Sequence, residues 1–139
     1  MSEYAPFDIE QKAIQAGATR QMAERIVDTL IDQGFINEER FVRAFIHDKF
    51  ELAHWGRIKI TAALRTKRIS SSLIATELET IAPDQYQATL TSILTAKNKQ
   101  VKATTPYERS RKLAAFAASR GFEPHLIFDA LDAMNLGDE

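Results

Sequence analysis

Residues 34–53 read GFINEERFVRAFIHDKFELA, and they combine a helix start with a helix-long apolar pattern. Gly34 is a stop signal for the segment before it. Asn37 predicts an N-cap, because its side chain can accept a hydrogen bond from a free amide of the first turn. Two glutamates follow at once, and their charge is favourable near a helix N-terminus. The stretch therefore predicts a helix from Asn37 to about Ala53.

This helix is apolar on two sides. One stripe holds Phe41, Ala44, Phe45 and Leu52, and the other holds Val42, Ile46 and Phe50. A helix with two apolar sides is expected to lie between neighbours. The pattern therefore predicts a central helix.

The flanking sequence predicts further helices. Apolar residues recur at helical spacing before Gly34, namely Met22, Ala23, Ile26, Val27, Leu30 and Ile31. The run Thr105-Pro106-Tyr107-Glu108 has the form of a capping box with proline at the first helical position, and its helix ends near Gly121. Pro83 and Pro124 are also typical of helix starts. No alternating β-branched segment competes with these patterns, so the sequence predicts an all-α protein.

Aligning Gly17, Arg68 and Gly121 shows a weak internal repeat of about 50 residues. The apolar columns are Ile9, Ile60 and Leu113; Met22, Leu73 and Leu126; and Val27, Leu78 and Leu131. Chance register between amphipathic helices is the alternative. The repeat predicts tandem three-helix repeats in an elongated, curved array. We expect a first repeat at 1–54, a second repeat and linker at 55–104, and a third, incomplete repeat at 105–139 with a tail from Gly137.

Length and composition restrict the class of protein. The chain has 139 residues, the size of one domain, and it is 45% hydrophobic and 27% charged, as in a globular protein. It has no cysteine, which excludes disulfides and thiolate metal sites and fits a reducing compartment. There is no secretory signal and no apolar run of membrane-spanning length. We expect a cytoplasmic, monomeric protein with no membrane association.

Charge is distributed unevenly along the chain. Residues 1–56 hold six basic and ten acidic residues, whereas residues 57–139 hold twelve basic and nine acidic ones. The basic residues concentrate in two segments, 57–68 and 97–120. Such segments indicate either a surface for a polyanion or an acidic protein groove, or simply two solvated helix faces.

The sequence does not suggest an enzyme. The five glycines are scattered, so there is no phosphate-binding loop. The three histidines accompany neither a nucleophilic triad nor a metal-ligand cluster, and we expect no cofactor, no metal and no catalytic residue. Trp55 predicts packing at a junction between repeats, with an exposed binding anchor as the alternative. Phenylalanines such as Phe122 and Phe128 predict core or inter-repeat packing.

The block 34–70 resembles the core of RecX regulatory proteins. It carries the family's acidic cap before an Arg40-Phe41 pair, then the run Trp55-Gly56-Arg57 and the basic stretch 65–68. Residues 112–122 are similar to the family's last repeat, and the resemblance spans about 6–134. Two features depart from it. Family members usually carry another helix before the position of Ser2, and Arg68 stands where the second repeat often has glycine.

This resemblance implies a protein that lies in the groove of the RecA–DNA filament and lowers recombinase and ATPase activity without catalysis. The basic residues would then face acidic filament surface or DNA phosphate. The predicted partner-binding residues are Arg43, Lys49, Arg57, Lys59, Arg65, Lys67, Arg109, Arg111, Lys112 and Arg120. The alternatives are a general DNA-binding helical protein and a helical-repeat adaptor for an unrelated protein.

Overall fold

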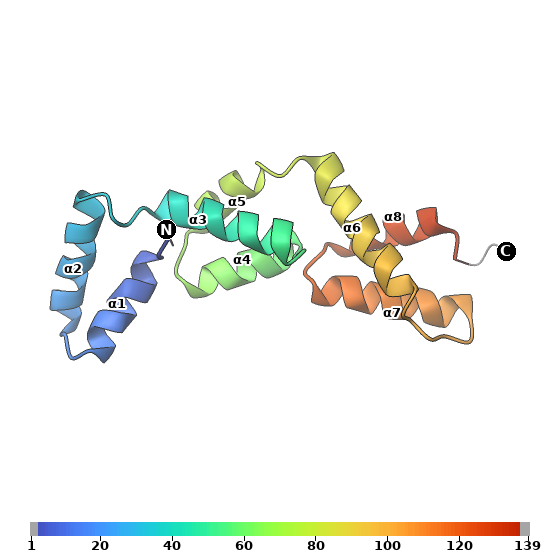
Figure 1. The fold of residues 1–139 in the computed structure, drawn as a ribbon, viewed down its shortest axis with the longest axis horizontal. Helices are drawn as coiled ribbons and strands as arrows, with labels where there is room; N and C mark the ends of the chain where they lie inside the picture. Colours follow the sequence, from blue (N-terminus) through green and yellow to red (C-terminus); the bar gives the residue numbers. More distant parts are fainter. Residues whose placement is uncertain (1–2, 137–139) are drawn as a thin grey trace.

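The computed structural model describes residues 3–136, and within them it contains helices and no strand. In chain order the helices are α1 (Pro6–Gln15), α2 (Arg20–Asp32), α3 (Glu38–His47), the π-helical segment η1 (Asp48–Leu52), α4 (Arg57–Thr66), α5 (Ser71–Leu78), α6 (Pro83–Asn98), α7 (Pro106–Ser119) and α8 (Pro124–Met134) (Figure 1). The all-α prediction is confirmed.

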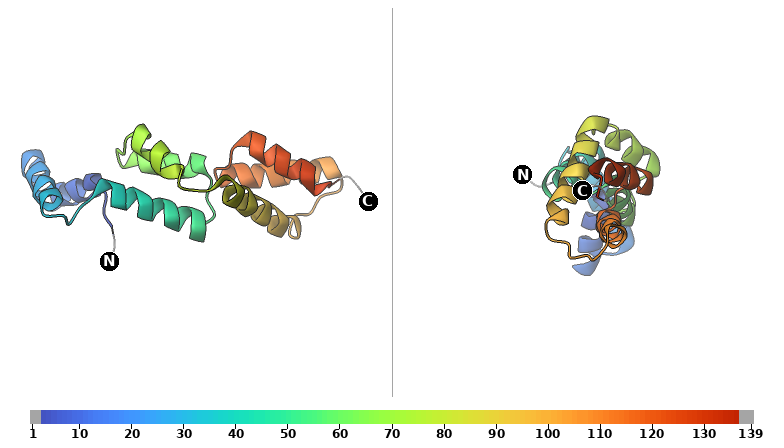
Figure 2. Two further views of the ribbon diagram at one scale, coloured as in Figure 1. Left: turned by 90° about the horizontal axis from the view of Figure 1, so that it is seen from above. Right: turned by 90° about the vertical axis from the view of Figure 1, so that its right-hand side faces the viewer.

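The helices form an elongated row of units rather than a ball (Figure 2). The α1–α2 hairpin lies at one end, α3 packs on α5, and α6 packs on both α7 and α8. Each of the two larger units is thus a long helix packed on the hairpin that follows it. The divisions predicted from the sequence, 1–54, 55–104 and 105–139, group each long helix with the hairpin before it, and they stay a prediction. The predicted tail from Gly137 lies outside the described residues.

The capping residues fix where two helices begin. Asn37 Oδ1 accepts from the amide of Arg40 at 2.9 Å, as predicted. Thr105 Oγ1 accepts from the amide of Glu108 at 3.1 Å. Glu108 does not reach back to Thr105, however, but accepts from the amide and hydroxyl of Thr104. Those two hydrogen bonds, with Lys112 nearby, lower the pKa of Glu108 to about 2.

The helix predicted from Asn37 to Ala53 is present, but its end winds as a π-helix. Phe41, Val42, Ile46 and Phe50 are buried, which confirms most of the two-sided pattern. Leu52 is 73% exposed and does not continue the first stripe. A π-helix has more residues per turn than an α-helix. Residues at α-helical spacing therefore do not stay on the face that packs on the core.

The turns that align the repeat share a residue with positive φ. Gly17, Arg68 and Gly121 all have positive φ, at 109°, 60° and 93°. Arg68 therefore adopts the left-handed conformation that glycine adopts in the other two turns, and its guanidinium lies 4.6 Å from the centre of the Phe7 ring. Arginine at this position thus keeps the positive φ that glycine has in the other two turns.

The core runs along the row of units rather than through one centre. Ile60, Leu64 and Leu113 are fully buried, and Tyr86 and Phe122 pack together with ring centres 5.1 Å apart. Phe128 is an exception to the predicted packing, because it is 58% exposed. It lies beside the groove between α7 and α8, on a side that no other described helix covers.

Candidate binding surface

The two three-helix units meet at a backbone contact. The amide of Gly56 donates to the carbonyl of Arg120 at 2.7 Å, and the amide of Ile58 donates to the carbonyl of Gly121 at 2.9 Å. The approach is so close that a Cβ on Gly121 would lie 2.3 Å from the Cβ of Lys59. The start of α4 and the turn between α7 and α8 are therefore held against each other.

Arg57, Tyr86 and Glu123 form a polar cluster inside this junction. Arg57 pairs with Glu123 at 2.6 Å and lies 3.7 Å from the centre of the Tyr86 ring. The hydroxyl of Tyr86 accepts from the amide of Arg57 at 2.9 Å and donates to Glu123. Arg57 was predicted to bind a partner, but its guanidinium is engaged inside the protein.

The cluster shifts the pKa of two of its members. Burial and the hydrogen bond to Glu123 raise the pKa of Tyr86 well above its ordinary value. Burial alone would raise the pKa of Glu123, but the hydrogen bonds from Tyr86 and Arg57 together lower it below its ordinary value. Glu123 is therefore a carboxylate at neutral pH.

Trp55 lies beside this junction and is flanked by two lysines. It is half-buried and packs against the core, as predicted. The Nζ of Lys49 lies 4.8 Å and the Nζ of Lys59 lies 4.5 Å from the centre of its ring. Both lysines were predicted binding residues, and one aromatic side chain brings them together.

A second pair of cations lies over the ring of Phe116 on the other unit. Lys97 Nζ lies 5.0 Å and Arg120 Cζ lies 5.2 Å from the centre of its ring. Lys97, Phe116 and Arg120 line an open cleft of about 290 Å³ together with His54. The backbone links this cleft to the first pair of cations, because His54 is the chain neighbour of Trp55 and the amide of Gly56 donates to the carbonyl of Arg120.

We call Lys49, Lys59, Lys97 and Arg120 the junction cations. Within residues 3–136 none of them forms an ion pair with a carboxylate. An aromatic ring carries no net charge to offset the field of a cation above it, whereas a paired carboxylate offsets that field. Each junction cation is half-buried, so part of the residue is exposed to an anionic partner.

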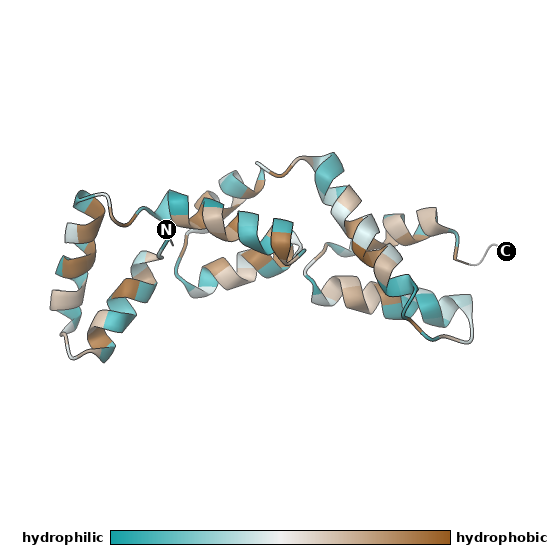
Figure 3. Ribbon diagram, viewed as in Figure 1, coloured by the Kyte–Doolittle hydropathy of each residue, from teal (hydrophilic) through white to brown (hydrophobic). Residues whose placement is uncertain are grey.

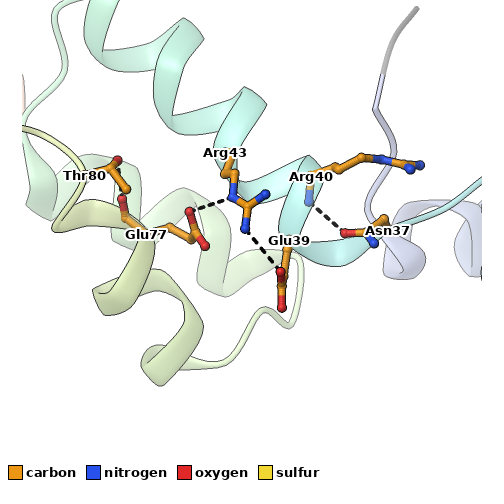
Figure 4. Close-up of polar contacts among 6 residues, drawn as sticks. All are labelled: Asn37, Glu39, Arg40, Arg43, Glu77 and Thr80. Carbon is orange, nitrogen blue, oxygen red and sulfur yellow. Dashed lines mark hydrogen bonds and ion pairs between the residues drawn. The ribbon is translucent and has the colours of Figure 1, made fainter.

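Most other predicted residues have partners inside the protein. Arg43 pairs with Glu77 at 3.1 Å and with Glu39 at 3.2 Å (Figure 4). The remaining contacts are Arg65 to the carbonyl of Ile69, Lys67 to Asp8, Arg109 to the carbonyl and side chain of Asn98, and Lys112 to Glu108 and the carbonyl of Lys102. Arg111 is exposed at the groove between α7 and α8.

The structure therefore brings together three of the ten predicted residues, Lys49, Lys59 and Arg120. Lys97 was not among the ten, although it lies in the second basic segment. Its position over the ring of Phe116 depends on how α6 crosses α7, which sequence spacing does not give. Six of the other seven predicted residues are engaged, because carboxylates and carbonyls of the same chain lie against them; Arg111 is the exception.

Residues 3–136 hold neither a metal-binding cluster nor a membrane-spanning helix. No group of three or more His, Cys, Asp and Glu side chains is arranged to hold a metal ion. No helix in this range is both long enough and apolar enough to cross a membrane.

The fold matches solved structures of RecX proteins. One, a crystal structure of regulatory protein RecX, has a TM-score of 0.85 at 18% identity, covering 94% of this chain and 64% of that chain. RecX from Lactobacillus salivarius has a TM-score of 0.84 at 14% identity, covering 97% of this chain and 88% of the other. These identities are low, so the matches concern the fold.

Sequence comparisons give the same family. The chain is 25% identical over 126 residues to the regulatory protein RecX of Pelodictyon phaeoclathratiforme, covering 89% of this chain and 76% of the relative. It is 28% identical over 116 residues to that of Clostridium tetani, covering 82% of this chain but 53% of the longer relative. The model of the second three-helix domain of RecX matches residues 37–78, and that of the third matches residues 84–131. The chain therefore belongs to the RecX family of regulatory proteins.

Proposed function

We propose that this protein binds the RecA–DNA filament in the cytoplasm and lowers its ATPase and strand-exchange activity by binding alone. The observation that carries the proposal is the set of junction cations, which lie where two helical units meet and have no carboxylate partner among residues 3–136. A row of units suits a periodic partner such as a filament, because each unit can meet an equivalent surface.

Because the junction cations are positively charged, we expect electrostatic contacts with the partner. They would face filament carboxylates or DNA phosphates, where binding arises mainly from charge and weakens as salt rises. Six of the ten residues predicted from sequence have polar partners within the fold, so we assign them no direct contact. They are Arg43, Arg57, Arg65, Lys67, Arg109 and Lys112.

The test is the DNA-dependent ATPase of the cognate RecA, titrated with this chain at two salt concentrations. We expect dose-dependent suppression that weakens at the higher salt concentration. The double variant Lys59→Glu/Arg120→Glu should require at least about tenfold more protein, because two attractive contacts become repulsive.

A matched control reverses two cations that lie away from the junction, Lys12→Glu/Arg25→Glu, on the exposed faces of α1 and α2. It should suppress the ATPase as the parent chain does. Equal losses in both double variants would show that only net charge matters. No suppression by a folded chain at several-fold excess would refute the proposal. Equally tight binding to bare DNA would favour a general DNA-binding protein.

A further inference from the structure

The cleft of about 290 Å³ beside Phe116 concentrates basic side chains from three parts of the chain. Among the described residues, three basic side chains and no carboxylate line it. His54 lies just after η1, Lys97 lies in the last turn of α6, and Arg120 lies just after α7. That last turn is hydrophilic, whereas the middle of α6 is more hydrophobic (Figure 3). The rest of the lining is apolar apart from the amide side chain of Gln100.

A second cleft shows that basic lining is not sufficient for an anion site. Arg43 and His47 line a larger cleft of about 500 Å³ beside α3, but Glu51 lines it as well. Arg43 is also paired with two glutamates, so its charge is already balanced. In the smaller cleft, Lys97 and Arg120 have no carboxylate partner within the described range 3–136.

The two strongest cations of the smaller cleft are held in place by the fold. The carbonyl of Arg120 accepts from the amide of Gly56 at 2.7 Å, and the carbonyl of Lys97 accepts from the amide of Gln100 at 2.9 Å. Both side chains also lie over the ring of Phe116, at 5.0 Å and 5.2 Å from its centre. Because these positions are fixed before a ligand arrives, binding an anion orders little more of the chain.

The donors of the cleft suit a phosphate group better than a carboxylate. Lysine and arginine supply several N–H donors, and the imidazole of His54 can donate in either protonation state. A carboxylate has two acceptor oxygens, whereas a phosphate group presents more of them around one centre. Arginine and lysine are both common phosphate ligands. The volume lies at the lower end of the roughly 300–1,000 Å³ of small-molecule pockets, which favours a small group.

We propose that this cleft binds a phosphate group through Lys97 and Arg120, with a further hydrogen bond from His54. The group belongs either to the backbone of a nucleic-acid strand or to a free nucleotide. The inference rests on the proposed function, because Lys97 and Arg120 are two of the junction cations. It assigns phosphate, rather than filament carboxylates, to this pair.

The test titrates inorganic phosphate into the ¹⁵N-labelled full chain at constant ionic strength and follows the amide chemical shifts. We expect saturable shifts around His54, in the last turn of α6 and around Arg120. Succinate, which carries two carboxylates, should bind at least roughly threefold more weakly, because it offers fewer acceptors around one centre.

Three variants locate the contact. Lys97→Ala should weaken phosphate binding at least about tenfold, because it removes a charged donor. His54→Asn should weaken it about threefold. His54 has a φ of 57°, a conformation that asparagine also adopts, so this change keeps the backbone. The matched control is Lys99→Ala, an exposed lysine outside the cleft, which should change the affinity by less than about twofold.

Two further probes identify the source of the phosphate. A thymidine tetranucleotide without a terminal phosphate that shifts the same amides would assign the cleft to a nucleic-acid backbone. Shifts with thymidine 5′-monophosphate but not with the tetranucleotide would assign it to a free nucleotide.

Other outcomes would overturn the inference. These are the absence of saturable shifts, shifts away from the cleft, and equal losses in Lys97→Ala and Lys99→Ala. Succinate binding as tight as phosphate binding would assign the cleft to protein carboxylates instead. Suppression of the RecA ATPase by a chain that binds no phosphate would overturn this inference alone. Phosphate binding by a chain that does not suppress the ATPase would overturn the proposed function alone.

Discussion

At the residue scale, the junction depends on a few side chains whose roles the sequence could not give. The caps at Asn37 and Thr105 could be predicted, because a cap is a relation between residues three positions apart. The cluster of Arg57, Tyr86 and Glu123 could not, because it joins residues from three helix starts. A basic residue in a basic segment has the sequence pattern of a binding residue. Only the structure shows the carboxylate, distant in sequence, with which it pairs.

Removing the hydroxyl of Tyr86 should weaken this cluster without leaving a cavity in the core. In Tyr86→Phe the ring still packs on Phe50 and Phe122, but the amide of Arg57 and the carboxylate of Glu123 each lose a partner. We expect unfolding to require about 1–3 kcal/mol less free energy. Urea denaturation measures the change, and a stability equal to that of the parent chain would contradict the assigned hydrogen bonds.

The cluster should also make stability depend on pH. The pKa of Glu123 is lower in the folded chain than its ordinary value of 4.5 in the unfolded chain. Its contribution is therefore complete above about pH 4.5 and is lost as pH falls through the lower, folded pKa. Glu123→Gln should cost about 1–2 kcal/mol at pH 7, and the difference from the parent should shrink at pH 3. A difference that is constant with pH would contradict this account.

At the scale of elements, the helices and their order followed from apolar spacing, prolines and caps. The π-helical segment η1 that follows α3 could not be predicted, because no local residue signals a wider turn. This winding precedes His54, which has a φ of 57°, and Trp55. The sequence pattern predicts plain α-helix for this segment. It therefore does not predict the position of Trp55 between Lys49 and Lys59.

The contact between the two units should be sensitive to a single methyl group. Gly121 has a φ of 93° and its Cβ would overlap Lys59, so Gly121→Ala should cost about 2–4 kcal/mol. Gly17 has a φ of 109° with nothing within 4 Å, so Gly17→Ala should cost only about 1 kcal/mol. Equal losses in urea denaturation would show that the two units do not meet as closely as described.

At the scale of the whole molecule, the repeat explains the elongated shape. A row of similar units could be predicted from aligned apolar columns, and the shared left-handed turns at Gly17, Arg68 and Gly121 support that alignment. The aligned apolar positions do not show which hairpins are covered by a long helix. The same spacing predicts a buried position at Ile26 and at Ala130, and only the packing distinguishes them.

The proposed function depends on binding of the filament by the junction cations. Its most direct test is the affinity of this chain for RecA filaments assembled on single-stranded DNA, measured by fluorescence anisotropy beside the affinity for the same DNA alone. We predict that binding to the filament is tighter, that Lys59→Glu/Arg120→Glu weakens it at least about tenfold, and that Lys12→Glu/Arg25→Glu leaves it unchanged. Filament binding that is unaffected by the junction reversal would contradict the account.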